Sequence, residues 1–207
     1  EYLPFVILVF SLFVVAGGIR LVGNLVGNPA TNTAMLGIGT LAASFVGTTG
    51  ASMLLIRPLI LANQDRHYNS HVFIFFIFLV ANIGGSLTPL GDPPLFLGFL
   101  KGVDFLWTMT AMFPPMAVAA VILLSVFYLI DRYHWRKEGA AWPVSGVPRQ
   151  LRIEGLHNVV YLAGILIAVV LSGVWKPNVT VPLGLGVELP LEGLVRDCLL
   201  LVLSYLS

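Results

Sequence analysis

The stretch that decides the fold is NIGGSLTPLGDPPLF, Asn82–Phe96. It overlaps Val72–Gly91, a run of 20 residues without Lys, Arg, Asp or Glu, which is long enough to cross a hydrocarbon core of about 30 Å. The glycine pair Gly84-Gly85 and three prolines interrupt helical hydrogen bonding here. Irregular backbone at membrane depth persists only where it is buried in protein or lines a watery cavity. The sequence therefore predicts a discontinuous transmembrane helix that holds a small solute.

The composition is that of a polytopic membrane protein. Hydrophobic residues make up 57% of the chain and charged residues only 10%, and the mean hydropathy is +0.93. Soluble proteins average about 25% charged residues. The net charge of +1, without a dense basic surface, argues against a nucleic-acid partner. The expected partners are the lipid bilayer and a small ion.

A second break in an apolar run predicts a helical hairpin. After a first span over about 2–22, the uncharged run Leu21–Ile56 extends for 36 residues, which is too long for one span and short for two. Val46–Gly50 interrupts this run. We therefore predict a re-entrant helical hairpin over 31–63, with its tip at 46–50.

The remaining segments complete one repeat and begin another. The broken helix covers 71–101 and an unbroken span covers 105–130, so that 1–135 forms a first-repeat transport unit. The polar segment 131–154 holds five of the eleven Lys and Arg residues and is a cytoplasmic loop by the positive-inside rule. Residues 155–207 begin a second repeat that the chain does not complete, which predicts a piece of a larger carrier.

Counting spans from that cytoplasmic loop assigns the other connections. Residues 63–71 and Arg20 fall on the cytoplasmic side, so the hairpin enters and leaves from there. Lys101, Asp104 and the loop 176–191 fall outside.

The two breaks resemble those of a known group of carriers. The strings SFVGTTG, Ser44–Gly50, and NIGGSLTPLGDPP resemble the first half of a carrier in the ion transporter superfamily, most closely bacterial sodium/proton antiporters and citrate transporters of the citrate–metal/proton symporter type. The resemblance implies an all-α fold with an inverted second repeat, and secondary active transport by alternating access in the inner (plasma) membrane. A homodimer remains open.

One departure from the group limits what carries over. Many members have an Asp-Asn pair near the hairpin tip, where this chain has Gly47-Thr48-Thr49. A second carboxylate near the site is therefore missing, and a two-carboxylate antiport mechanism is not transferred.

Asp92 has two compatible interpretations. Gly-Asp-Pro-Pro puts Asp92 at the N-cap of a short helix with Pro93 at its first position. A carboxylate at membrane depth is also a functional-site hypothesis, because it can bind a cation or exchange a proton. No cofactor is expected beyond the transported Na⁺ and H⁺.

Oxygen atoms near the two breaks are the expected ion ligands. Side chains at the tip either cap the returning helix or coordinate Na⁺, and those beside Gly84-Gly85 either satisfy freed backbone groups or bind the cation together with unwound carbonyls. The predicted site comprises Thr48, Thr49, Ser52, Asn82, Gly84, Gly85, Ser86, Thr88 and Asp92. Arg57 either extends to the cytoplasmic interface or acts as a counter-ion to Asp92.

The favoured function is sodium (cation)/proton antiport. The alternative is a cation-coupled carrier of citrate or another carboxylate, because half-helix N-termini near 51 and 93 attract anions. An ion channel is less favoured because the chain has no repeating filter motif. An enzyme is not expected, because the sequence shows neither a nucleophile–base spacing nor a metal-ligand motif.

Overall fold

The computed structural model describes residues 2–22, 25–139, 152–175, 177, 179–182 and 188–207. The all-α prediction is confirmed, since the described strands are three-residue segments that form two small antiparallel ladders, β1–β2 and β3–β4. The elements in chain order are α1 (Tyr2–Gly17), β1 (Arg20–Val22), α2 (Pro29–Val46), α3 (Thr48–Asn63), α4 (Ser70–Leu79), the 3₁₀ helix η1 (Ile83–Leu87), α5 (Pro93–Leu100), α6 (Phe105–Glu138), β2 (Arg152–Glu154), α7 (Leu156–Val174), β3 (Thr180–Pro182), β4 (Glu188–Pro190) and α8 (Leu191–Leu206).

Helices α2 and α3 form a hairpin that turns at one residue. Asn28 caps α2 by accepting a hydrogen bond from the Thr31 N–H at 2.8 Å, and Pro29 occupies the first helical position. Gly47 separates the two helices with φ +82°, a backbone conformation that favours glycine. The turn lies inside the predicted tip at 46–50 but is much tighter. Its re-entry from the cytoplasmic side stays a prediction.

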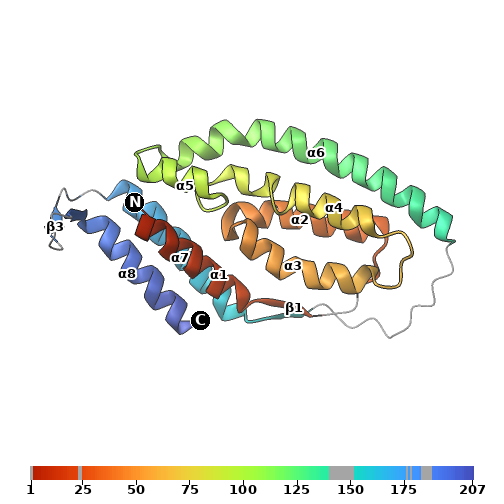
Figure 1. Ribbon diagram of the computed structural model, residues 1–207, viewed down its shortest axis with the longest axis horizontal. Coiled ribbons are helices and arrows are strands. Elements are labelled where there is room, and N and C mark those ends of the chain that lie inside the picture. The colour runs from red at the N-terminus through yellow and green to blue at the C-terminus, as the bar shows by residue number, and fades with distance from the viewer. Residues whose placement is uncertain (1, 23–24, 140–151, 176, 178, 183–187) are drawn as a thin grey trace.

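The interrupted helix follows the hairpin. Helix α4 ends at Leu79, η1 continues the path, and α5 begins at Pro93. The regular helix therefore ends before the glycine pair. At its end the Val80 and Ala81 N–H groups both donate to the Phe76 carbonyl. The bent path of α4, η1 and α5 runs beside α6 in Figure 1.

Two apolar cores lie on either side of the hairpin tip. One comprises buried side chains of α2, α3, α4 and α6, among them Leu36, Leu59 and Phe127. The other joins α1, α5, α7 and α8, with the start of α6, around Phe96 and Ile165. The hairpin, α4 and most of α6 therefore share one core, whereas Leu90 of the break packs with α1, α5, α7 and α8 in the other.

The polar segment predicted as a loop is partly helical. Helix α6 continues to Glu138 rather than ending at 130, because Asp131 and Glu138 form ion pairs inside the protein. Strand β2 pairs with β1, so that Arg20 lies opposite Glu154. The middle of the predicted loop, 140–151, lies outside the described residues.

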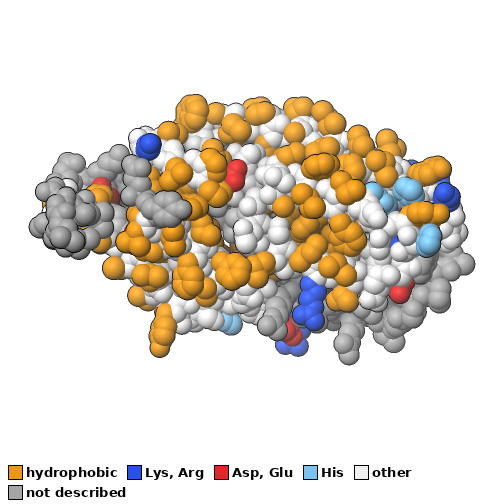
Figure 2. Space-filling model, viewed as in Figure 1, with side chains coloured by type: hydrophobic (Ala, Val, Ile, Leu, Met, Phe, Trp, Pro, Cys, Tyr) orange, Lys and Arg blue, Asp and Glu red, His pale blue; other side chains and the backbone are white. Residues whose placement is uncertain are grey.

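Membrane-length helices cover much of the molecule. Within the described residues, three helical segments are long and apolar enough to cross a bilayer: Ser70–Leu87, Phe105–Glu138 and Leu156–Val174. Figure 2 shows hydrophobic side chains spread over the visible face, with only a few charged ones among them. An apolar exterior of this kind suits contact with lipid.

Candidate functional site

The hairpin tip packs into the interrupted helix. Ser44 Oγ, in the last turn of α2, donates a hydrogen bond to the Gly84 carbonyl at 2.6 Å. In return Thr88 Oγ1 donates to the Ser44 carbonyl. The Thr48 N–H, at the start of α3, donates to the Gly91 carbonyl at 3.3 Å. Side-chain and backbone hydrogen bonds thus hold the two irregular segments together.

The glycine pair makes this close approach possible. A Cβ atom added to Gly84 would lie 2.6 Å from the Thr40 carbonyl oxygen, and one added to Gly85 would lie 2.6 Å from Thr48 Cγ2. Both separations are far below van der Waals contact, so a side chain at either position would push α2 or α3 away. Gly84 and Gly85 are therefore packing residues of the site.

A small pocket lies where the tip, the break and α1 meet. Its volume is about 90 Å³. Its polar wall comes from the tip and from the backbone before α5, and its apolar wall comes mainly from α1. The lining residues are Phe5, Leu8, Val9, Leu12, Phe13, Val46, Gly47, Thr48, Thr49, Gly50, Pro89, Leu90, Gly91, Asp92, Pro93 and Phe96.

Asp92 lines this pocket without serving as a side-chain cap. It occupies the N-cap position of α5, yet its carboxylate forms no capping bond within the described chain. Pro93 and Pro94 lack N–H groups, and the Leu95 N–H donates to the backbone carbonyl of Asp92 at 3.1 Å. Asp104, by contrast, caps α6 by accepting from the Trp107 N–H at 2.8 Å. The Asp92 carboxylate is therefore available for a ligand.

The local field of the pocket has two opposing contributions. Helices α3 and α5 both begin at the pocket, at Thr48 and Pro93. The N-terminal end of a helix carries a partial positive charge that attracts anions. The Asp92 carboxylate offsets part of that charge and attracts a cation. The pocket therefore places the partial positive charge of two helix N-termini beside one negative carboxylate.

The polar side chains at the break mainly satisfy its own backbone. Asn82 is exposed, and its Nδ2 donates to the Ile77 carbonyl at 2.7 Å. Ser86 Oγ donates to the Ile83 carbonyl at 2.8 Å. Thr88 is buried and accepts from the Leu90 N–H at 3.2 Å. These three contacts match the interpretation in which side chains replace lost helical bonds.

Two further predicted residues lie outside the pocket. Ser52 is one turn beyond Thr48 on α3, and its Oγ is buried without a partner among the described residues. Arg57 is exposed, nine residues after Thr48, which is about 13 Å along the helix. The structure thus brings together Thr48, Thr49 and Asp92, and it separates Arg57 from the pocket.

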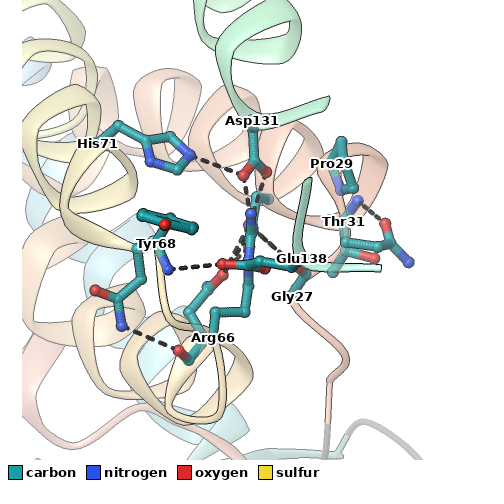
Figure 3. A network of polar contacts seen from close by, with 12 residues as sticks. Gly27, Pro29, Thr31, Arg66, Tyr68, His71, Asp131 and Glu138 are labelled. Carbon is teal, nitrogen blue, oxygen red and sulfur yellow. Dashed lines mark hydrogen bonds and ion pairs between the residues drawn. The ribbon is translucent and has the colours of Figure 1, made fainter. Parts of the chain in front are cut away.

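A second polar centre at the hairpin base was missed by sequence reasoning (Figure 3). Asp131 of α6 pairs with Arg66 Nη1 at 2.6 Å and accepts from Asn32 Nδ2 at 3.0 Å. The amides of Asn32 and Asn63 exchange two hydrogen bonds of 2.9 Å across the hairpin. Glu138 accepts from Arg66 Nε at 3.3 Å and from the Tyr68 N–H at 2.6 Å. We call this set of residues, together with His71, the base network.

Ser44 was also absent from the predicted site, although it begins the string SFVGTTG. Its position, three residues before the tip glycine Gly47, is the signal by which the sequence could have identified it. For the base network the sequence offers a weaker signal, because His71 and Asp131 are 60 positions apart. Only the fold brings them together.

One comparison with known protein families bears on this geometry. The sequence model of a family described as "Putative citrate transport" matches residues 1–207. The chain belongs to this family. Searches of curated proteins and of solved structures returned no match. Membership in this family agrees with the citrate-transporter side of the resemblance, and it makes the chain part of a transporter family of the membrane.

Proposed function

We propose that this chain forms an ion- and substrate-binding unit of a cation-coupled carrier of citrate or a related carboxylate, in a bacterial plasma membrane. The observation that carries the proposal is the pocket between the hairpin tip and the break, where two helix N-termini meet the Asp92 carboxylate. Membership in the citrate-transport family supports the choice of anion.

Each wall of the pocket has a role in this proposal. Asp92 binds the coupling cation, because its carboxylate is a hard oxygen ligand at membrane depth. The Thr49 and Gly50 N–H groups, in the first turn of α3, and the hydroxyls of Thr48 and Thr49 bind a carboxylate group of the substrate. Arg57 takes no part.

The size of the pocket limits what it holds in this conformation. At about 90 Å³ it is well below the roughly 300–1,000 Å³ of typical small-molecule sites. It has room for an ion and a few waters, but a whole tricarboxylate requires it to widen. A carrier that works by alternating access passes through such a change.

Sodium/proton antiport is the second candidate. Asp92 favours it, because a carboxylate in the pocket can serve as a ligand for Na⁺. An antiporter moves protons when Na⁺ is added without any organic anion, whereas a coupled carboxylate carrier requires the anion. The two candidate functions therefore differ in whether ion movement requires an organic anion.

The experiment measures uptake of labelled citrate and movement of protons in vesicles that contain the protein, with Na⁺, K⁺ or a pH gradient supplied in turn. We expect cation-dependent citrate uptake. Thr49→Val should weaken it, because the variant removes a pocket hydroxyl, whereas Thr110→Val, at an exposed position of α6, should not. Na⁺-driven proton movement that ignores citrate would replace this proposal with the antiporter.

A further inference from the structure

A second cavity lies where the ends of several helices meet. The residues around it come from the α5–α6 connection, the end of α7 and the beginning of α8, with Pro4 of α1. These segments gather near the N-terminus in Figure 1. The volume of the cavity is about 450 Å³, which lies within the roughly 300–1,000 Å³ of typical small-molecule sites. None of the described residues lines both this cavity and the tip pocket. We call it the α8 cavity.

A buried ion pair forms part of the wall of the α8 cavity. Arg196 Nη2 and Nε each lie 2.8 Å from Asp197 Oδ1, and the two side chains are only 4% and 10% exposed. The Arg196 guanidinium also lies over the Phe96 ring, 5.7 Å from its centroid, and an aromatic face attracts a cation. Arg196 is thus already paired. Because both contacts use Oδ1, the other oxygen of Asp197 can accept from a further donor.

Glu192 adds a carboxylate with an unused oxygen. It lies in the first turn of α8, where the partial positive charge of a helix N-terminus stabilises an acidic side chain. That partial charge explains why an acid is tolerated here, but it supplies no hydrogen bond to both oxygens. Glu192 Oε2 is buried and has no hydrogen-bond partner among the described residues. A buried charged acceptor without a donor is destabilising, so a ligand that donates to Oε2 would bind favourably.

The other polar side chains of the described wall do not supply that donor. Ser172 Oγ donates to the Val169 carbonyl at 2.8 Å, and the Asp104 carboxylate accepts from the Trp107 N–H at 2.8 Å. The charged groups of this wall are therefore three carboxylates and one guanidinium, and the guanidinium is paired. The excess of negative charge favours a cation over an anion as the ligand.

The rest of the wall is apolar. Its side chains include Phe99, Leu106, Val170, Val174 and Leu194. An inorganic cation would leave this apolar surface in contact with water. An organic ammonium ion would cover it, and the burial of apolar surface is favourable in proportion to the area removed from water. The α8 cavity therefore matches an amine with an apolar body better than it matches a metal ion.

We propose that the α8 cavity binds a primary ammonium ion that carries an apolar body. The ammonium group donates hydrogen bonds to Glu192 Oε2 and to the free oxygen of Asp197, and the apolar body packs against Phe99 and its neighbours. Hydrogen bonds between opposite charges are roughly twice as strong as neutral ones. A free amine and the ethanolamine headgroup of a membrane lipid share this chemistry. The site is separate from the tip pocket, so it does not depend on which ion or anion the protein transports.

The test compares the binding of 2-phenylethylamine and 2-phenylethanol to the protein in phosphatidylcholine nanodiscs by isothermal titration calorimetry, with empty nanodiscs as the blank. The two probes share an aromatic ring and differ in their polar end, since an alkyl ammonium is charged at neutral pH. We expect the amine to bind about tenfold or more tightly than the alcohol. Equal affinities would overturn the proposal. This comparison needs no variant.

A matched pair of variants locates the bound amine. Glu192→Gln keeps the size of the side chain but removes its charge, and it should weaken amine binding about tenfold or more. Glu154→Gln, at an exposed position of β2, should leave the affinity unchanged. Cation-driven citrate uptake by Glu192→Gln should equal that of the wild type, because Glu192 does not line the tip pocket. Equal amine affinity of Glu192→Gln and the wild type would overturn the proposal.

The bilayer composition separates the two sources of the ammonium group. The headgroup of phosphatidylcholine has no N–H donor, whereas that of phosphatidylethanolamine has a primary ammonium. The amine titration is therefore repeated in nanodiscs that also contain phosphatidylethanolamine. Weaker amine binding there would identify the lipid headgroup as a competing ligand of the α8 cavity, and unchanged binding would identify a free amine.

Discussion

The two ends of the hairpin are built from different interactions. At the tip, glycines and backbone carbonyls meet, and the Asp92 carboxylate has no capping bond within the described chain. At the base, charged and amide side chains are bonded to one another, with Asp131 fully buried. A typical hydrogen bond contributes about 1 kcal/mol, whereas breaking a buried ion pair costs about 3–5 kcal/mol. The same two helices are thus fixed at one end and open to a ligand at the other.

The largest expected effect is on the stability of the base. Arg66→Ala leaves Asp131 buried without its cation, which should lower the free energy of unfolding by about 3–5 kcal/mol. Denaturation in detergent, followed by circular dichroism, measures this loss. Arg136→Ala, at an exposed position of α6, should change stability by about 0.5 kcal/mol or less. Similar losses for both variants would show that the Arg66–Asp131 ion pair does not stabilise the hairpin base.

A smaller loss is expected where the tip meets the break. Gly85→Ala puts a Cβ atom 2.6 Å from Thr48 Cγ2, which should cost about 1–3 kcal/mol by overpacking. Gly37→Ala, whose new Cβ would meet Leu124 Cδ1 at 3.7 Å, is the control and should be tolerated. The free energy of unfolding of the two variants checks the prediction. Equal stability would mean that the tip and the break separate easily.

The smallest effect concerns one hydroxyl. Thr88→Val removes the bond from Thr88 to the Ser44 carbonyl and the bond that Thr88 Oγ1 accepts from the Leu90 N–H. It should cost about 1–2 kcal/mol, since buried backbone groups lose a partner. Thr33→Val removes a bond within its own helix, to the Pro29 carbonyl, and should cost less. Thermal unfolding of the pair decides whether tertiary contact or local structure dominates. A larger loss for Thr33→Val would argue against the contact.

The hairpin and the interrupted helix could be predicted because their signals are local. Gly47 and the run from Gly84 to Pro94 break helices wherever they occur, and charge-free runs mark membrane depth. The direction of each side chain at the break was not predictable. The Asn82 side chain bonds to the Ile77 carbonyl just before the break, whereas the Thr88 side chain bonds to Ser44 of the hairpin. The directions differ because a 3₁₀ segment and two turns rotate successive residues by irregular angles.

The base network could not be predicted from the sequence, for a different reason. Asn32, Arg66 and Asp131 come from three separate segments, and no periodicity links them. In the sequence alone, each resembles an ordinary polar residue at the membrane–water interface. The end of α6 was misjudged for the same reason, because a run rich in charge predicts a loop unless its partners are known.

The central claim is that Asp92 serves the pocket through its charge and not as a helix cap. The measurement is the initial rate of cation-driven citrate uptake in vesicles for Asp92→Asn and for Asp104→Asn. Asn caps a helix about as well as Asp, so Asp104→Asn should transport normally. Asp92→Asn should lose about tenfold or more, equivalent to about 1.4 kcal/mol or more. Normal uptake by folded, inserted Asp92→Asn would contradict the account.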